Sequence, residues 1–514
     1  MTSSSPVVVR PAPAPRRPSA GRAGVVTLVG AALNAVLAFV VAGTVSNVLG
    51  ADSTGHFFQG IALFSIVATA VTLGTDTAMV RQASRLQALG RTDRVRPVLV
   101  SSVRVVLALG TVVATLSWVL APALAERLAG PDQQEALVQT VRALAPFLPL
   151  AALMSVLLGT SRGLGQVYPY TLIQNTLVPG ARAAAVGVVV LGALGTGARG
   201  PGSPGLGALL TAWAAPLALG VLVAVLVIRR AGTATRAVAQ SRADRRELWS
   251  FALPRGAAAL VERGLDWADV LLVMALAGPA AGGVYAIVRR LAGVGGLLES
   301  TMRIVTGPMI SRAFAHGDRR ELAALFQQGS GVLVLVGGPV YVTLIVLGGE
   351  VLALFGPEFP LGRVALAVVA AAFLLETACG MLQTMLLMGG KSHWQLQNKT
   401  AQLVVLVVVA VLLVPRLGLL GAALAWAAGV LTNLVLATGQ VRTLCGARPS
   451  LRTVALPATL VALTFGALPV AAGQLVGWTP VSLLLVLAAA GLSHLVLVLL
   501  LRHHLPLSDF WERT

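Results

Sequence analysis

Long apolar stretches, separated by short polar segments, recur along the whole chain. Most of them are close to the length of about 20 residues that a helix needs to cross the hydrocarbon core of a bilayer. The pattern predicts fourteen transmembrane helices, so the expected fold class is an all-α polytopic membrane protein. The predicted spans are residues 24–49, 56–80, 98–121, 137–159, 170–195, 205–228, 250–277, 282–306, 330–355, 362–388, 400–415, 418–441, 453–475 and 480–501.

The composition agrees with this interpretation. Apolar residues make up 56% of the 514 residues and charged residues only 11%, which excludes an ordinary soluble domain. The net charge of +19 would suggest nucleic acid binding in a soluble protein. Outside the predicted spans, however, the chain has no basic helix or basic patch interleaved with aromatics, so we expect no nucleic-acid partner. Cys379 and Cys445 are the only cysteines, and we expect no disulfide and no cofactor.

The loop arginines alternate sides in step with the predicted spans. If the N-terminus is cytoplasmic, nearly all basic loop residues fall on the cytoplasmic side, where anionic lipid favours them. The opposite side keeps only Arg127, Arg199, Arg363 and Arg416. The sequence therefore predicts a multi-pass protein of the inner (cytoplasmic) membrane, with both termini in the cytoplasm.

Several short signatures occur twice in the same order. Gly55-His56-Phe57-Phe58 is matched by Gly283-Val284-Tyr285, and the segment from Gly205 to Trp213 is matched with equal spacing by Gly418 to Trp426. This predicts two six-helix halves related by an axis along the membrane normal. The expected divisions are a disordered basic tail (1–22), an N-terminal half (23–230), a cytoplasmic linker (231–248), a C-terminal half (249–445) and two extra helices with a short tail (446–514).

Ionisable residues gather in the seventh and eighth predicted spans. Charges at bilayer depth cost several kcal/mol unless they face a cavity or a partner, so they are candidate functional residues. In the seventh span, the spacing i, i+7, i+11 and i+14 places four of them on one helical face. These four are Arg255, Glu262, Asp266 and Asp269, and the next span holds Arg289, Arg290, Glu299 and Arg303. Structural ion pairs, or residues at headgroup level, are the alternative explanation.

Together these features resemble the multidrug/oligosaccharidyl-lipid/polysaccharide exporter superfamily, over about residues 24–445. The resemblance rests on Val48-Leu49-Gly50, on the repeated signatures, on Arg289-Arg290-Leu291, on Gly317-Asp318 and on the segment from Pro415 to Ala425. Its closest branch looks like the polysaccharide-biosynthesis flippases. This implies a non-enzymatic flippase that moves an undecaprenyl-pyrophosphate-linked oligosaccharide by alternating access. Its expected partners are that lipid-linked oligosaccharide, the bilayer and a polysaccharide polymerase or glycosyltransferases.

The resemblance also implies a central cavity with basic residues for the lipid pyrophosphate. Arginine suits this task because its planar fork contacts phosphate oxygens in a bidentate way. The candidates are Arg289, Arg290, Arg303, Arg142, Arg182 and Arg255. Embedded carboxylates are candidates for a coupling ion or a counter-charge, with Asp266 and Asp269 as candidate sodium ligands. They are Glu262, Asp266, Asp269, Glu299 and Glu376.

Two alternatives stay open at this point. The number of acidic residues in the seventh span also suits a cation-coupled exporter of drugs or small molecules from the same superfamily. A membrane-embedded glycosyltransferase or ligase is the other alternative, but the external loops are short and hold no His/Asp constellation. The lipid II flippases are disfavoured because the first span, between Gly24 and Leu49, carries no charge.

Overall fold

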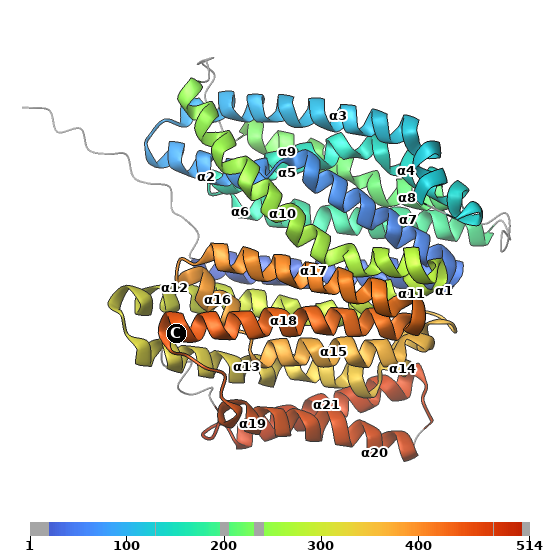
Figure 1. Cartoon of the computed structure of the whole chain (residues 1–514), viewed down its shortest axis with the longest axis vertical. Helices are drawn as coiled ribbons and strands as arrows, with labels where there is room; N and C mark the ends of the chain where they lie inside the picture. The colour runs from blue at the N-terminus through green and yellow to red at the C-terminus, as the bar shows by residue number, and fades with distance from the viewer. Residues whose placement is uncertain (1–19, 129, 196–204, 231–240, 476, 506–514) are drawn as a thin grey trace, which may run out of the picture.

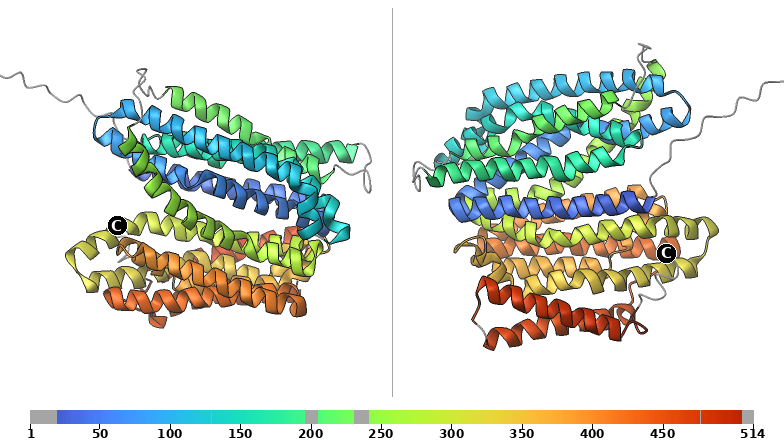
Figure 2. Two further views of the ribbon diagram at one scale, coloured as in Figure 1. Left: turned by 45° about the horizontal axis from the view of Figure 1, so that its top comes forward. Right: turned by 180° about the vertical axis from the view of Figure 1, so that it is seen from behind.

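The structure, a computed structural model, describes residues 20–128, 130–195, 205–230, 241–475 and 477–505. Within these ranges every regular element is helical, which confirms the predicted all-α polytopic fold. The helices form two bundles, one from each half of the chain, and the last helices pack outside the second bundle (Figure 1). Turned views show the same stacking of the two bundles (Figure 2).

The helices of the N-terminal half are α1 (Ala20–Thr72), α2 (Thr75–Ala88), α3 (Val95–Leu128), α4 (Gln134–Leu144), α5 (Leu148–Gly163), α6 (Val167–Leu172), α7 (Val178–Gly195), α8 (Leu206–Ala214) and α9 (Pro216–Arg230). Those of the C-terminal half are α10 (Arg242–Ala277), α11 (Pro279–Ala292), α12 (Gly296–His316), α13 (Arg319–Val346), α14 (Gly348–Ala353), α15 (Arg363–Ala378), α16 (Leu382–Met388), α17 (Ser392–Leu417) and α18 (Leu419–Cys445). The outer helices are α19 (Leu451–Val461), α20 (Leu468–Leu475) and α21 (Pro480–Leu500).

Twelve stretches of the described chain are long and apolar enough to cross a membrane. One of them, Val29–Thr72 in α1, holds two predicted spans, because Gly50 breaks the helix with φ 76° and ψ −178°. Helix α10 is not among the twelve although it has 36 residues, since it carries many charged residues. Four of them, Arg255, Glu262, Asp266 and Asp269, were predicted to share one helical face, which we call the charged stripe. With these two additions the helices account for all fourteen predicted spans. The span predicted at 400–415 is longer than expected, because α17 begins at Ser392.

Two glycine turns, one in each half of the chain, have a similar backbone conformation. Gly278, which lies 228 residues after Gly50, has nearly the same conformation, with φ 88° and ψ 171°. Only glycine reaches this region easily, so both halves turn at an equivalent point. Nearby, a Cβ on Gly55 would collide with the carbonyl of Pro279, and a Cβ on Gly283 with the carbonyl of Ala51. Gly283 lies 228 residues after Gly55, and Pro279 lies 228 residues after Ala51. The two contacts are therefore equivalent, and a local two-fold axis between the two glycines relates them.

Helix α10 follows the N-terminal half in the sequence and packs against helices of both bundles. It begins at Arg242, inside the segment predicted as a linker, and its first turns lie against the N-terminal half. There Asp244 pairs with Arg94 at 3.6 Å, and Glu247 pairs with Arg85. Its later turns pack against α17 and α11 of the C-terminal half, and Figure 1 shows the helix crossing from one bundle to the other. The charged stripe of α10 therefore runs along the junction between the halves.

Candidate functional site

A cavity of about 550 Å³ lies between the two halves. It is lined from the N-terminal half by α1, α2, α5, α7, α8, α9 and the π-helical segment Ile173–Leu177, and from the C-terminal half by α10 and α11. Its polar lining includes Asn34, Gln174 and several hydroxyl groups, and Trp213 and Trp267 supply aromatic surface. Seven charged residues line it, and they are Asp76, Arg182, Arg255, Glu262, Arg263, Asp266 and Arg290. We call this space the central cavity.

The charges that α10 brings to the central cavity are paired with one another. Arg255 donates from both terminal nitrogens to Glu262, at 3.1 and 3.2 Å. Arg263 donates to Asp266 at 3.2 Å, one turn further along the helix. Both ion pairs are solvent-accessible, so water screens them and each contributes little to stability. The stripe predicted from the sequence is thus largely neutralised within α10 itself.

Arg182 and Arg290 differ from the other arginines of the cavity. Arg182 donates to the carbonyl of Trp213 at 3.0 Å, and its guanidinium lies 4.0 Å from the centroid of that indole. Arg290 lies 5.0 Å from the centroid of Phe58, with the carbonyl of Ala38 at 3.5 Å. Among the described residues neither arginine forms an ion pair with a carboxylate, and both line the central cavity. Two uncompensated cations from opposite halves therefore face one cavity.

Arg289, although adjacent to Arg290, has different surroundings. Successive residues point about 100° apart on a helix, and Arg289 lies inside the C-terminal half. It pairs with Asp269, whose side chain is 1% exposed, and its guanidinium lies 3.4 Å from the ring centroid of Trp426. Tyr285 bridges this pair to α18, with its hydroxyl 3.3 Å from Asp269 and 3.2 Å from the Ala422 carbonyl. This buried ion pair ties α10, α11 and α18 together.

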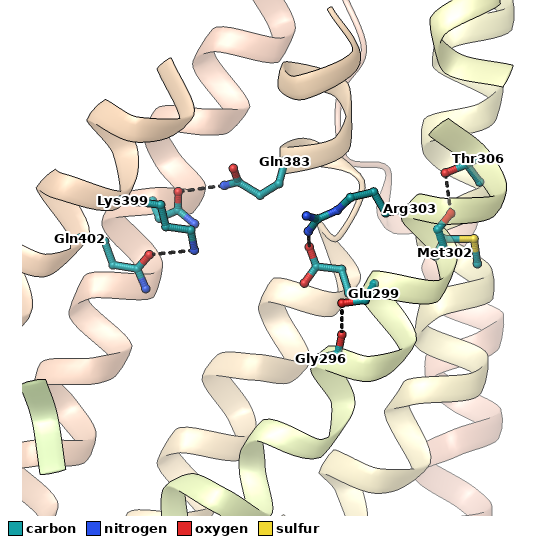
Figure 3. Close-up of polar contacts among 10 residues, drawn as sticks. Gly296, Glu299, Met302, Arg303, Thr306, Gln383, Lys399 and Gln402 are labelled. Carbon is teal, nitrogen blue, oxygen red and sulfur yellow. Dashed lines mark hydrogen bonds and ion pairs between the residues drawn. The ribbon is translucent and has the colours of Figure 1, made fainter. Parts of the chain in front are cut away.

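A second polar cluster in the C-terminal half lies apart from the central cavity. Arg303 donates to Glu299 at 3.2 Å within α12 (Figure 3). Glu299 and Glu376 line a separate cavity of about 30 Å³ together with Tyr341. On the facing helix α17, Lys399 donates to Gln402 at 3.2 Å. Arg303, Glu299 and Glu376 are therefore not among the described residues that line the central cavity.

Arg142 lies elsewhere, in the N-terminal half. Its guanidinium is 4.9 Å from the ring centroid of Trp118 in α3, and it does not line the central cavity. Of the six arginines predicted for substrate, the central cavity thus brings together Arg182, Arg255 and Arg290. Sequence analysis did not single out Asp76, which follows the turn at Gly74 and lines the cavity at the start of α2. Asp76 could have been found from the sequence, because it is a carboxylate inside the predicted span 56–80.

Nothing in this arrangement suits a tightly held metal ion. Among the residues described, no three or more His, Cys, Asp or Glu side chains are grouped to hold one. The two candidate sodium ligands each face an arginine, Asp266 facing Arg263 and Asp269 facing Arg289. What the cavity can do is bind an anion at Arg182 and Arg290, while its amides, hydroxyls and indoles contact a polar headgroup.

A family model described as polysaccharide biosynthesis protein matches residues 20–314, which is more than half of the chain. The chain belongs to this family. A sequence search of the curated proteins finds no match.

Solved structures of transporters share the fold of this chain. The lipid II flippase MurJ in an inward closed conformation has a TM-score of 0.71 at 10% identity, over 93% of this chain and 99% of that one. An inward-facing multidrug resistance MATE transporter of the MOP superfamily has a TM-score of 0.65 at 16% identity, over 82% and 98%. A MOP superfamily transporter from Pyrococcus furiosus, titled for the reverse polarity of its binding pocket, has a TM-score of 0.59 at 17% identity, over 88% and 97%. The chain therefore shares the fold of these transporters.

Proposed function

We propose that this protein translocates an undecaprenyl-pyrophosphate-linked oligosaccharide across the inner membrane by alternating access. The observation that carries the proposal is the pair Arg182 and Arg290, which face the central cavity from opposite halves without a described carboxylate partner. The family to which the chain belongs and the fold it shares with a flippase both support it. In this role the protein is not an enzyme, and it works beside the glycosyltransferases or polymerase that make and use its substrate.

The physical reason lies in the charge of the substrate. A pyrophosphate carries about two negative charges, and burying one isolated ion costs on the order of 20 kcal/mol by the Born argument. Two arginines that face the same cavity can compensate this charge. Each guanidinium can meet phosphate oxygens with two parallel hydrogen bonds. The remaining polar lining, including Asn34 and Gln174, is available to the sugar hydroxyls.

An anion held by both arginines would also connect the two halves. At one end of the bundle the halves already touch at Gly55 and Gly283. There the Ala51 amide donates to Glu358 at 2.8 Å, and the Asn47 side chain donates to the Leu354 carbonyl at 2.9 Å. Rocking of the halves would open this end and close the other. We expect the basic, arginine-rich end of the bundle to face the cytoplasm, with both termini on that side.

The carboxylates enter the proposal as counter-charges or as sites for a coupling ion. Asp269 holds the charge of Arg289, while Glu262 and Asp266 neutralise the arginines of α10. We expect Asp266 or Asp269 to be needed in the transport cycle. Transport assays of Asp266→Asn and Asp269→Asn, singly and together, test this. Unchanged transport and unchanged expression in all three variants would remove the carboxylates from the mechanism.

The central test uses vesicles reconstituted with the full chain and a labelled polyprenyl-pyrophosphate oligosaccharide. Arg182→Gln and Arg290→Gln should each reduce flipping at least about tenfold, since each removes a charge-assisted phosphate contact. Arg290→Lys should recover part of the rate, because lysine keeps the charge and loses the fork. Arg263→Gln is the matched control, as this cavity arginine is already paired with Asp266. Full activity in both glutamine variants would contradict the proposal.

A cation-coupled exporter is the second candidate, and Asp76 favours it. This carboxylate lines the central cavity, and among the described residues it has no basic partner. An organic cation could be held there and at the carboxylates of α10. Export of cationic dyes that survives Arg182→Gln and Arg290→Gln but is lost in Asp76→Asn would favour the exporter over the flippase.

A further inference from the structure

The N-terminal half contains a groove away from the central cavity. It has a volume of about 320 Å³ and lies between α3 and the junction of α4 with α5. Figure 1 places α3 at the edge of the N-terminal bundle farthest from the C-terminal half. Apolar residues form most of the lining. The lining residues are Thr111, Ala114, Thr115, Trp118, Pro146 and Pro149. We call it the lateral groove.

The sequence explains why the helices separate here. Thr111, Thr115 and Trp118 are spaced i, i+4 and i+7, so they share one face of α3. Opposite them, Pro146 lies in the short 3₁₀ turn Ala145–Phe147 that interrupts the helix between α4 and α5. Proline lacks the N–H that would continue the helical ladder. Directly beside Thr111 the helices touch, since a Cβ on Gly110 would lie 3.0 Å from the Cα of Pro149.

Arg142 lies at one end of the lateral groove. It precedes Pro146 by four residues and Pro149 by seven, so all three lie near the same helical face. Its guanidinium stacks on Trp118, which lines the groove and is 48% exposed. Arg142 is about 12 Å along α4 from the first residue of that helix. Among the described residues it has no ion pair, so a charge inside the predicted span 137–159 meets only an aromatic face.

The groove is surrounded by exposed apolar side chains of a predicted transmembrane helix, where lipid is expected. Val112, Leu116 and Val119 of α3 are each more than half exposed, as expected of side chains that face acyl chains. An uncompensated arginine at this depth is costly, and such residues find a counter-charge or reach toward the headgroups. The lipid phosphate is the counter-charge that the bilayer itself supplies, and the guanidinium fork matches its oxygens.

We propose that the lateral groove binds one acyl chain of an anionic phospholipid of the surrounding bilayer, with the lipid phosphate held by Arg142. This takes Arg142 out of the substrate pathway for which the sequence suggested it. The lipid would fill the gap that the two prolines create and compensate the embedded charge. The proposal is independent of the transported substrate, because no residue of the groove lines the central cavity.

Trp118 reports on the occupant. The full chain is reconstituted in vesicles that contain phosphatidylglycerol or phosphatidylcholine with brominated acyl chains, which quench nearby indoles. The signal of Trp118 is the difference between the wild type and Trp118→Phe. Brominated phosphatidylglycerol should quench it with a relative binding constant roughly threefold to tenfold above that of brominated phosphatidylcholine, the range expected for one charge-assisted contact. Arg142→Gln should bring this ratio to about one, and Arg142→Lys should keep part of it.

Arg127→Gln is the matched control. Arg127 lies at the exposed end of α3 in the same half, so its removal should leave the ratio unchanged. Equal quenching by the two lipids in the wild type would overturn the proposal, as would a ratio that survives Arg142→Gln or falls equally in Arg127→Gln. Displacement of brominated phosphatidylglycerol by an equimolar polyprenyl phosphate would assign the groove to the substrate's lipid and overturn its assignment to bilayer lipid.

Discussion

Trp213 in α8 and Trp426 in α18 are equivalent residues of the two halves, each eight positions after the glycine that begins its repeat. Each indole carries a stacked arginine, Arg182 at 4.0 Å and Arg289 at 3.4 Å. The two arginines come from helices α7 and α11, and only one of them has a carboxylate partner among the described residues. Arg182 faces the central cavity without a described carboxylate, whereas Arg289 is neutralised by Asp269. The halves therefore share a structural motif and use it for different purposes.

The same offset that relates Gly50 to Gly278 extends this comparison. It pairs Asp269, Tyr285 and Arg289 of the C-terminal half with Val41, Phe57 and Ile61 of the N-terminal half. The buried ion pair with its tyrosine thus replaces an apolar cluster. Val41 and Ile61 themselves line the central cavity. Matching positions of the two halves therefore hold a paired charge in one half and apolar side chains in the other.

The largest effect is expected from breaking the ion pair on one side only. Asp269→Val should lower the free energy of unfolding by about 3–5 kcal/mol, because Arg289 remains buried without its partner. The double variant Asp269→Val, Arg289→Ile installs the residues of the N-terminal half and should recover much of that loss. Thermal or denaturant unfolding of the purified protein measures both. If the double variant is less stable than Asp269→Val, the two halves are not interchangeable at this site.

The contacts of Gly55 and Gly283 with the opposite half should contribute similarly to stability. Gly55→Ala and Gly283→Ala each place a methyl group against a backbone carbonyl of the opposite half, and overpacking of this kind costs about 1–3 kcal/mol. The two losses should be similar, since the contacts are related by the local two-fold axis. Unfolding measurements on the two variants compare them directly. A loss confined to one variant would mean that the axis does not pass between these glycines.

The smallest effect is expected along α10. Glu262→Gln removes the partner of Arg255, but both side chains are about one-third exposed or more, so water compensates the charge. The free energy of unfolding should fall by less than about 1 kcal/mol. Asp266→Asn, which leaves Arg263, should behave the same way. A loss as large as that of Asp269→Val would show that the stripe supports the fold as strongly as the buried pair does.

Much of this architecture could be predicted from the sequence. Apolar length predicted the number of spans, and signatures that recur in the same order, such as those at Gly55 and Gly283, predicted two related halves. The depth of each charge in its span could also be read directly, because burial in lipid depends on position along the helix. That was enough to select Arg182 and Arg290, but it also selected Arg142 and Arg303, which do not line the central cavity.

What only the tertiary structure decided was the direction in which each charge points. Arg289 and Arg290 are adjacent in sequence and differ by about 100° around the helix, so the packing of α15 and α18 determines which one faces the cavity. Phe373 and Trp426 enclose Arg289 beside Asp269, while α1 leaves Arg290 open to the space between the halves. The hydrophobic pattern of the sequence indicates how deep a residue lies in the bilayer, since lipid surrounds the whole bundle. It does not indicate how each helix is rotated about its axis, because the rotation depends on packing against helices that are distant in the sequence.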